Sequence, residues 1–346
     1  MEKTELDPRS TARALVAPGK GILAADESSP TIEKRFKSVG VASTEENRRA
    51  YREMLLGTPG MESYISGVIL FDETIRGSTL DGTPFTELLA ARGIIPGIKV
   101  DRGAKMLAGA PGEKITEGRD GLRERLAEYG DLGARFTKWR AVYAIGPGTP
   151  SQACIRANAV ELARFAALSQ EAGLVPIIEP EVLMDGDHDI ESSADVTGHV
   201  LQSVFEELHV QHVHLEDLLL KTNMVLSGYD CPDQVTPDVT AYWTVRCLEH
   251  HVPVAVPGVV FLSGGQSEEV ATVNLDAINR RGGHPWELSF SFGRALQSSA
   301  LRAWADEPTD VATAQGEFMR RAAATAAART GSYASNERLG TVATHA

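Results

Sequence analysis

Two pairs of charged residues stand out because the members of each pair lie two positions apart in a short β-rich segment. Lys138 and Arg140 lie in the segment ARFTKWR, and Glu179 and Glu181 lie in VPIIEPE. Side chains two positions apart on a strand share one face of a sheet. Charges on a dry interior face are costly unless they are paired, so these pairs indicate a functional site. The apolar residues between them leave open which face points inward.

Other charged residues occur at the ends of neighbouring β-rich segments. Asp26 closes the first segment, and Lys221 lies just beyond the sixth. Asp101 and Arg102 follow the third. A single charged residue in such a position is usually a solvated loop residue, but that explanation does not account for so many of them. We therefore expect these residues to meet in one site.

Eight β-rich segments must position these residues, and each is followed by a longer stretch of helical character. Their starts recur about every 40 residues. Strands and helices alternating at this spacing predict a parallel sheet, and eight units predict one closed (β/α)8 TIM barrel of the α/β class, with its active site at the C-terminal strand ends. An open doubly wound sheet is the alternative. The predicted strands are Gly21–Asp26, Ile65–Phe71, Ile94–Val100, Ala134–Trp139, Val175–Glu181, His212–Asp217, Val254–Leu262 and Glu287–Phe292.

The segments after the last two predicted strands have the composition of a phosphate site. Ser263, Gly264 and Gly265 follow the seventh strand, and Gly293 and Arg294 follow the eighth. Phosphate groups are bound by backbone N–H groups at helix starts and by fixed cations. The loops after strands seven and eight also form a frequent phosphate site in this barrel. We therefore predict that the substrate carries a phosphate.

Helix signals account for most of the remaining chain. Ser43 and Glu46 form a capping box, Thr149-Pro150 and Thr236-Pro237 are typical helix starts, and the last two predicted helices are Arg294–Trp304 and Val311–Arg329. No linker divides the chain, so residues 1–330 are predicted to form one catalytic barrel domain. Residues 331–346 are predicted to form a flexible C-terminal tail.

Composition excludes several classes of protein. The 346 residues include 34 Lys and Arg against 47 Asp and Glu, a net charge of −13, which argues against nucleic acid or an anionic membrane as a partner. No apolar run is long enough to cross a bilayer, and the N-terminus lacks the pattern of a secretory signal. Three cysteines without a CxxC motif predict a reduced, cytoplasmic protein.

Two patterns suggest a metal site, but neither predicts one. His212 and His214 share a face of the predicted sixth strand, and that face would point toward the helices if the strand stayed regular up to Lys221. The segment DGDHD, residues 185–189, lacks the length and spacing of an EF-hand loop. We therefore predict no metal ligands and no cofactor.

Seven sequence blocks resemble the motifs of class I fructose-bisphosphate aldolases. They are GILAADES, GIKVD, KWR, PIIEPE, LLKTNMV, VPGVVFLSGGQSEE and FSFGRALQ. The blocks follow the order and spacing of that family from about Gly19 to about Arg329. The resemblance implies a (β/α)8 barrel, a lyase of glycolysis and gluconeogenesis, a sugar-phosphate substrate and a homotetramer.

The resemblance assigns a role to each of five charged residues. Lys221 corresponds to the lysine that forms a Schiff base, and Glu179 to the acid/base that dehydrates the carbinolamine. Asp26 corresponds to the base that takes the C4 hydroxyl proton, and Lys138 and Glu181 to the supporting lysine and carboxylate. This chemistry suits the residue types, because an amine attacks a ketone only when it is neutral and a second cation nearby favours the neutral form.

The resemblance also assigns the phosphate-binding residues. The expected substrate-binding set is Ser263, Gly264, Gly265, Gly293 and Arg294 for one phosphate, Ser28, Lys34 and Arg35 near the other, together with Arg102 and Arg140. Two features depart from the family. Arg102 stands where the family commonly has lysine, and the chain ends in THA where many members end in tyrosine, its last tyrosine being Tyr333.

Three functions are therefore compared. The first is reversible cleavage of fructose 1,6-bisphosphate, with fructose 1-phosphate and sedoheptulose bisphosphate as substrates that the sequence does not rank. The second is a metal-dependent barrel lyase that uses Glu179, Glu181 and the histidines, which chelator sensitivity would reveal. The third is a silent sugar-phosphate-binding protein, which would have little reason to keep both lysines and both glutamates.

Overall fold

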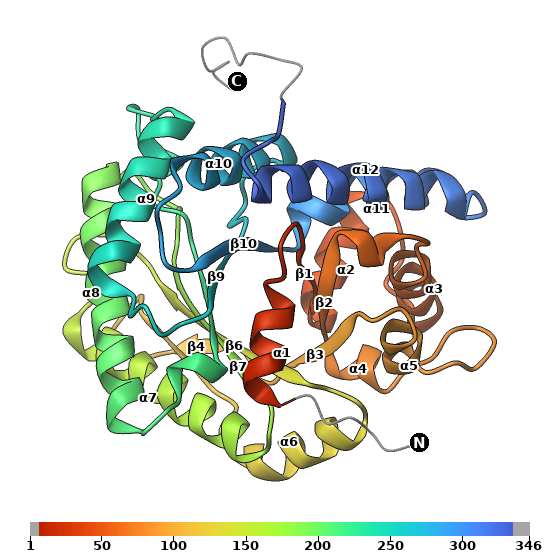
Figure 1. The fold of residues 1–346 in the computed structure, drawn as a ribbon, viewed down its shortest axis with the longest axis horizontal. Coiled ribbons are helices and arrows are strands. Elements are labelled where there is room, and N and C mark those ends of the chain that lie inside the picture. Colours follow the sequence, from red (N-terminus) through yellow and green to blue (C-terminus); the bar gives the residue numbers. More distant parts are fainter. Residues whose placement is uncertain (1–6, 335–346) are drawn as a thin grey trace.

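The computed structural model describes residues 7–334, which form a closed parallel barrel surrounded by helices (Figure 1). The strands follow one another around the barrel in the order β1, β2, β3, β6, β7, β8, β9, β10, with β10 pairing back to β1. Their bounds are β1 Gly21–Ala25, β2 Ile65–Leu70, β3 Ile95–Lys99, β6 Phe136–Tyr143, β7 Val175–Val182, β8 Leu219–Thr222, β9 Gly258–Phe261 and β10 Glu287–Phe292. The predicted TIM barrel is confirmed, and the open sheet is wrong.

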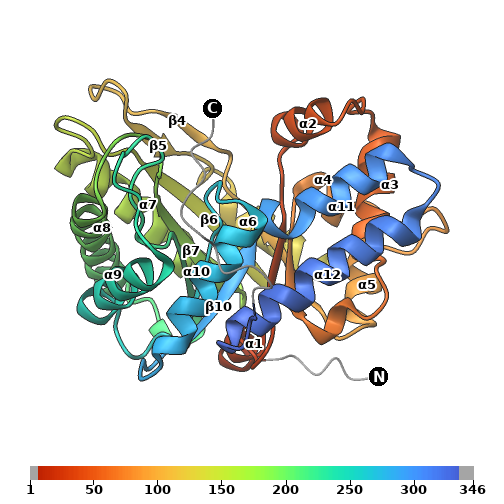
Figure 2. The same cartoon turned by 90° about the horizontal axis from the view of Figure 1, so that it is seen from above.

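Helices cover the outside of the barrel. They are α1 Pro8–Leu15, α2 Ser29–Ser38, α3 Glu45–Leu56, α4 Asp72–Ile75, α5 Phe85–Ala90, α6 Leu122–Asp131, α7 Gln152–Glu171, α8 Ile190–Val210, α9 Pro237–His251, α10 Glu268–Arg281, α11 Arg294–Asp306 and α12 Val311–Arg329. Neighbouring helices pack in chain order from α6 to α10 (Figure 1). Helix α12 packs on both α10 and α11 (Figure 2). This ring buries the outer faces of the strands.

One apolar cluster fills the interior of the barrel, and α1 closes its N-terminal end. The cluster joins strand residues to three residues at α1, and its members are Ala12, Leu15, Val16, Ile22, Ala24, Ile69, Phe136, Val175, Ile177, Leu219 and Val260. Ile177 belongs to this inner cluster and Ile178 to the outer one. The inward face of β7 is therefore the odd-numbered face, which settles the question that strand parity alone left open.

The sixth barrel strand lies later in the chain than predicted. The sequence HVHLED alternates like a strand, but Leu215–Asp217 form a 3-10 turn and His212 has a left-handed φ of 56°. The strand is β8, Leu219–Thr222, and all four of its residues are buried. A fully buried strand does not alternate, because both of its faces are covered. Lys221 therefore lies within the strand.

Two predicted helix starts need correction. The cap of α3 is Thr44, whose Oγ1 accepts a hydrogen bond from the N–H of Asn47, and not Ser43. Helix α7 begins at Gln152 with Ser151 as its cap, because the hydroxyl of Ser151 accepts a hydrogen bond from the N–H of Cys154. The predicted start of α9 at Thr236-Pro237 and both bounds of α12 are confirmed.

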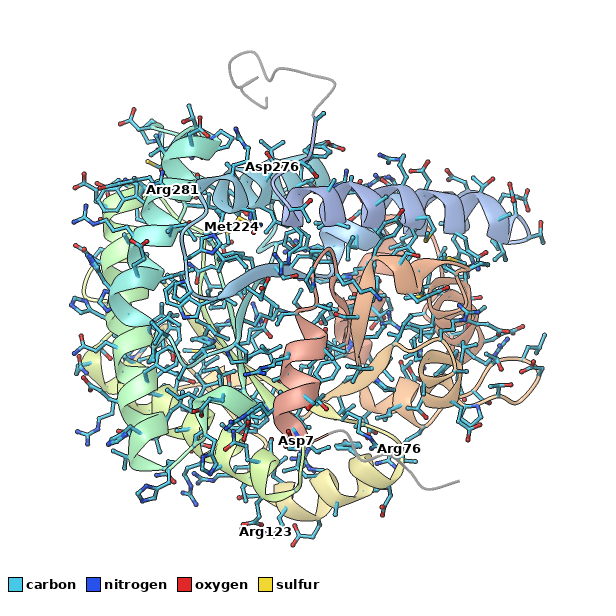
Figure 3. The ribbon with its side chains drawn as sticks, viewed as in Figure 1. Asp7, Arg76, Arg123, Met224, Asp276 and Arg281 are labelled. Carbon is cyan, nitrogen blue, oxygen red and sulfur yellow. The ribbon has the colours of Figure 1, made fainter. Side chains whose placement is uncertain are left out.

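Two features near the ends of elements were not predicted. A small antiparallel hairpin, β4 Ala104–Met106 and β5 Lys114–Thr116, follows β3. At the C-terminal end, the hydroxyl of Tyr333 donates to Glu269 and its N–H donates to Asp276 on α10. Figure 3 labels Asp276 on this helix. The rest of the predicted tail, from residue 335 onward, lies outside the described residues.

Within residues 7–334, no helix is both long enough and apolar enough to cross a membrane. The three cysteines, Cys154, Cys231 and Cys247, are buried free thiols.

Candidate active site

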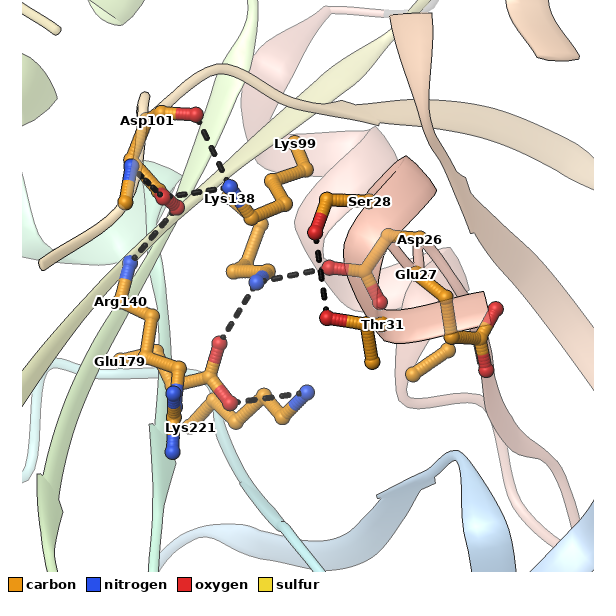
Figure 4. A network of polar contacts seen from close by, with 12 residues as sticks. Asp26, Glu27, Ser28, Thr31, Lys99, Asp101, Lys138, Arg140, Glu179 and Lys221 are labelled. Carbon is orange, nitrogen blue, oxygen red and sulfur yellow. Dashed lines mark hydrogen bonds and ion pairs between the residues drawn. The ribbon is translucent and has the colours of Figure 1, made fainter. Parts of the chain in front are cut away.

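A cavity of about 200 Å³ lies at the C-terminal ends of the barrel strands (Figure 4). Charged side chains dominate its lining, although the chain as a whole is acidic. The lining residues are Ala24, Asp26, Glu27, Ser28, Thr31, Arg35, Lys99, Lys138, Arg140, Glu179, Glu181, Lys221, Leu262, Ser263, Gly264, Ser291, Gly293 and Arg294.

The inward periodicity of the strands explains this concentration of charge. On several strands a residue of the inner apolar cluster is followed two positions later by a side chain that lines the cavity. Val175 and Ile177 are thus followed by Glu179 and Glu181 on β7. In the same way, Lys138 follows Phe136. The charged side chains therefore continue the inward faces of these strands beyond the apolar cluster.

Four side chains form a continuous chain of ion pairs at the centre of the cavity. Lys221 Nζ lies 3.0 Å from Glu179 Oε1, and Lys138 Nζ lies 3.0 Å from Glu179 Oε2. Lys138 Nζ also lies 2.7 Å from Asp26 Oδ2 (Figure 4). Glu179 Oε2 receives no well-directed hydrogen bond from the described residues, so a lone pair of this buried carboxylate is open to a proton. Glu179 therefore links the two lysines.

Burial and charge act in opposite directions on these groups. Burial would raise the pKa of Asp26 and of Glu179, but the cations Lys138 and Lys221 outweigh it and hold both pKa values below their ordinary range. Burial would lower the pKa of Lys138, but Asp26, Glu179 and Asp101 outweigh it and raise that pKa. Lys138 is therefore a permanent cation at neutral pH, and both carboxyls beside it are ionised.

A second set of ion pairs surrounds this centre. Arg140 pairs with Glu181, and burial, which lowers the pKa of Arg140, is outweighed by that carboxylate. Lys99 pairs with Asp101, whose other oxygen accepts a hydrogen bond of 3.2 Å from the N–H of Arg140. Lys99 lines the cavity but was not predicted as a site residue. It lies in the block GIKVD and on the inward face of β3, two positions after Gly97.

Glu27 is a further cavity residue that the sequence reasoning missed. It is buried and pairs with Arg35 on α2 and with Arg52 on α3. Gln297 on α11 donates to Glu27 Oε1 at 3.1 Å and to the carbonyl of Ala24 at 2.7 Å. This network holds α2 and its loop against the barrel, so Arg35 is fixed at the cavity edge. Glu27 lies in the block GILAADES, but strand alternation places it on the face opposite to Asp26. The sequence pattern therefore did not indicate that it lines the site.

The loop after β9 contains the glycines that the sequence predicts to bind phosphate. Gly264 and Gly265 have left-handed φ values of 58° and 102°, and a side chain at Gly264 would overlap Met184 Cε. The guanidinium of Arg294, the first residue of α11, lies beside Gly265 and forms no ion pair with the described residues. Among the described residues, the N–H groups of Gly264 and Gly265 have no hydrogen-bond acceptor, so two backbone donors and a cation without an ion-pair partner meet at the cavity mouth.

The structure brings most of the predicted site residues together, but three of them, Lys34, Arg102 and Gly265, do not line the cavity. Gly265 is exposed at the rim beside Arg294. Lys34 is exposed on α2 and does not line the cavity. Arg102 is exposed beyond β3 and is also absent from the lining. Ser28 lines the cavity, with its hydroxyl 3.1 Å from that of Thr31. Ser291 was not predicted, yet its buried hydroxyl lines the cavity without a hydrogen-bond partner in the described chain.

The histidines suggested as metal ligands lie away from the cavity. His212 and His214 are exposed in the connection before β8, so the suggested strand face does not exist. Between residues 7 and 334, no three His, Cys, Asp or Glu side chains are grouped so that they could hold a metal ion. The acid groups of the cavity are instead paired with lysine and arginine.

This arrangement suits reactions of a carbonyl compound that carries phosphate. A buried lysine lies in contact with a carboxylate that can exchange protons with it, and a second carboxylate lies across a fixed cation. Such a set can form a carbon–nitrogen bond, remove water from the adduct and take a proton from the same substrate. The glycine loop and Arg294 can hold a phosphate at the rim.

Known proteins resemble this chain over nearly its whole length. A family model described as fructose-bisphosphate aldolase class-I matches residues 7–345. A Xanthomonas campestris protein named probable fructose-bisphosphate aldolase class 1 is 58% identical over 313 residues, 90% of this chain and 94% of the relative. Fructose-bisphosphate aldolase 4, cytosolic, of Arabidopsis thaliana is 53% identical over 332 residues, 96% and 84% of the two chains.

A solved structure agrees with these sequence matches. Fructose-bisphosphate aldolase from Plasmodium falciparum, in complex with TRAP and a small-molecule inhibitor, superposes with a TM-score of 0.94 at 48% identity and covers 97% of each chain.

Proposed function

Because the chain belongs to the class I fructose-bisphosphate aldolase family, a family of lyases, we propose that it cleaves fructose 1,6-bisphosphate reversibly through a Schiff base on Lys221. The products are dihydroxyacetone phosphate and glyceraldehyde 3-phosphate. The observation that carries this proposal is the chain of contacts from Lys221 through Glu179 and Lys138 to Asp26. It supplies a nucleophile, an acid/base, a cation and a second base within one cavity.

The first half of the reaction joins the substrate to the enzyme. The neutral amine of Lys221 attacks the C2 carbonyl and forms a carbinolamine. Glu179, which lies 3.0 Å from Lys221 Nζ, transfers the protons that release the C2 oxygen as water and leave an iminium ion. Lys138 stays protonated throughout, because its pKa is raised by the carboxylates around it. Its fixed charge lies on the other side of Glu179 from Lys221.

The second half breaks the carbon–carbon bond. Asp26 takes the proton of the C4 hydroxyl, the C3–C4 bond breaks, and glyceraldehyde 3-phosphate leaves. The electron pair of that bond passes into the iminium and gives an enamine. Protonation of the enamine at C3 and addition of water at C2 then release dihydroxyacetone phosphate. The low pKa of Asp26 keeps it ionised and ready to accept the proton.

Two wider properties belong to the same proposal. We place the enzyme in the cytoplasm, in glycolysis and gluconeogenesis, which the cytosolic Arabidopsis thaliana relative supports. We expect a homotetramer from the family resemblance, and light scattering of the purified protein measures it. Comparing kcat/KM for fructose 1,6-bisphosphate, fructose 1-phosphate and sedoheptulose bisphosphate ranks the three substrates.

Activity in the presence of a chelator separates this function from the metal-dependent alternative. Purified enzyme incubated with excess EDTA is expected to cleave fructose 1,6-bisphosphate at its original rate, because lysine chemistry needs no metal ion. The assay couples triose phosphate formation to NADH oxidation. A loss of activity that Zn²⁺ restores would favour a metal-dependent lyase. Substrate binding without turnover would favour the silent binding protein.

Replacing Arg294 with alanine is expected to weaken substrate binding and to leave the bond-breaking step largely intact. A charge-assisted hydrogen bond is worth about 1.5–3 kcal/mol, so KM should rise roughly 10- to 150-fold. Steady-state kinetics measure the change. Arg302→Ala is the matched control, since Arg302 is an exposed residue of the same helix. An unchanged KM in Arg294→Ala would remove this residue from the phosphate site.

A further inference from the structure

Tyr229 lies on a loop that is joined by backbone hydrogen bonds to the loop of a neighbouring strand. The N–H of Tyr229 donates to the carbonyl of Met184 at 2.8 Å. The N–H groups of Gly228 and Asp230 donate to the carbonyls of His188 and Gly186 at 2.8 and 2.9 Å. The loops that follow β7 and β8 therefore form one ladder, and the position of the Tyr229 backbone is fixed by two strands.

The side chain of Tyr229 reaches a third loop, the one proposed to bind phosphate. Its hydroxyl donates a hydrogen bond of 3.1 Å to the carbonyl of Gly264 and lies 3.4 Å from Met184 Sδ. A Cβ atom placed on Gly265 would lie 3.3 Å from this hydroxyl and 3.3 Å from Arg294 Nη2. The phenol follows β8 and the guanidinium follows β10, so the two groups reach the backbone of Gly265 from the two strands that neighbour β9.

The hydrogen bond to Gly264 fixes the direction of the next N–H group. In a planar trans peptide the C=O and N–H groups point in opposite directions. When Tyr229 holds the carbonyl of Gly264, it also orients the N–H of Gly265. Neither the N–H of Gly264 nor that of Gly265 has a hydrogen-bond acceptor among residues 7–334. These two donors are thus available to an anion. Without the hydrogen bond from Tyr229, the two glycines would leave their peptide free to rotate.

The phenol keeps its proton over the working pH range of an enzyme. Burial raises the pKa of Tyr229 to about 12, opposed by the nearby charge of Arg294. The hydroxyl is therefore a constant hydrogen-bond donor at neutral pH.

We propose that Tyr229 is a positioning residue for the phosphate of the substrate. It holds the Gly264–Gly265 peptide so that its N–H group and Arg294 bind one phosphate together. This inference rests on the proposed function for the identity of the substrate, but the binding of phosphate itself does not depend on turnover.

The test compares Tyr229→Phe with the wild-type enzyme. The variant keeps the ring and loses one hydrogen bond, so KM for fructose 1,6-bisphosphate should rise about 3- to 10-fold. The inhibition constant of inorganic phosphate, measured as a competitive inhibitor, should rise by the same factor. The kcat should stay within about twofold, because the hydroxyl does not contact the reacting carbons. Tyr242→Phe is the matched control, since Tyr242 is exposed on α9 and its hydroxyl accepts a hydrogen bond from Arg246.

The outcomes separate the possible roles of Tyr229. Unchanged KM and unchanged inhibition by phosphate would overturn the proposal. A lower melting temperature with a lower kcat and an unchanged KM would show a purely structural role and would also overturn it. If the wild-type enzyme does not cleave fructose 1,6-bisphosphate, the proposed function fails, and calorimetric titration of both proteins with inorganic phosphate still tests Tyr229.

Discussion

Replacing Lys221 with methionine is expected to lower kcat for cleavage of fructose 1,6-bisphosphate by roughly 10⁵-fold or more, the scale at which enzymes respond to loss of a covalent nucleophile. No other described lysine can take its place without moving. Lys138 is a cavity lysine, but its amine is bound by both Asp26 and Glu179 and stays charged. Methionine preserves the length and the apolar stem of the side chain, so the barrel should fold. Steady-state kinetics with the triose phosphate assay measure the effect.

Covalent trapping identifies the nucleophile directly. Borohydride added with dihydroxyacetone phosphate should inactivate the wild-type enzyme, because it reduces the iminium to a stable secondary amine. Peptide mapping by mass spectrometry should find the adduct on Lys221. The Lys221→Met enzyme should stay unlabelled, while Lys37→Met, which changes an exposed lysine of α2, should be labelled like the wild type. An adduct on Lys138, or no adduct, would overturn the assignment of Lys221.

The barrel and most of its site could be predicted because both depend on the same short-range pattern. A residue pair such as Glu179 and Glu181 shares a face by strand geometry alone. The eightfold alternation of strands and helices then places the ends of all strands at one rim. The pattern does not show which face of each strand points into the barrel. Ile177 in the inner cluster supplies that direction in the folded chain.

The errors have physical causes that a single sequence does not reveal. Strand β8 is fully buried, so its sequence does not alternate between apolar and polar residues. The segment HVHLED does alternate, and the strand was therefore predicted too early in the chain. Glu27 and Tyr229 act through contacts with elements far along the chain, such as Arg52 on α3 and Gly264 after β9. Such contacts depend on how loops fold over the rim, which local periodicity does not determine.

Replacing Lys138 with methionine is expected to damage both catalysis and stability, because Lys138 neutralises two buried carboxylates at once. Removing one partner of a buried ion pair costs about 3–5 kcal/mol, since the remaining charge is left without compensation. The kcat should fall by roughly 10²–10⁴-fold, the usual contribution of a group that supports proton transfer. Arg294-dependent phosphate binding should change little, so the inhibition constant of inorganic phosphate should stay near the wild-type value.

The pH dependence of stability gives this variant a signature that simple loss of packing would not produce. The pKa values of Asp26 and Glu179 are lowered in the folded protein relative to about 3.9 and 4.3 in an unfolded chain. A carboxyl with a lowered pKa stabilises the fold above its unfolded pKa, and this contribution disappears as the pH falls through its folded pKa. Lys138 causes much of that lowering, so the variant should lose most of the contribution.

Urea unfolding measured from pH 7 down to pH 3 should therefore show a difference between wild type and Lys138→Met that is largest at neutral pH. Below about pH 4 the difference should shrink, because Asp26 and Glu179 of the unfolded wild-type chain begin to take up protons while they stay ionised in the folded protein, so the wild-type enzyme loses its advantage. Lys105→Met, a change to an exposed lysine of β4, should match the wild type throughout. A difference that stays constant across this range would mean that Lys138 contributes packing alone, and the ion-pair chain that links Lys221 to Asp26 would then need another explanation.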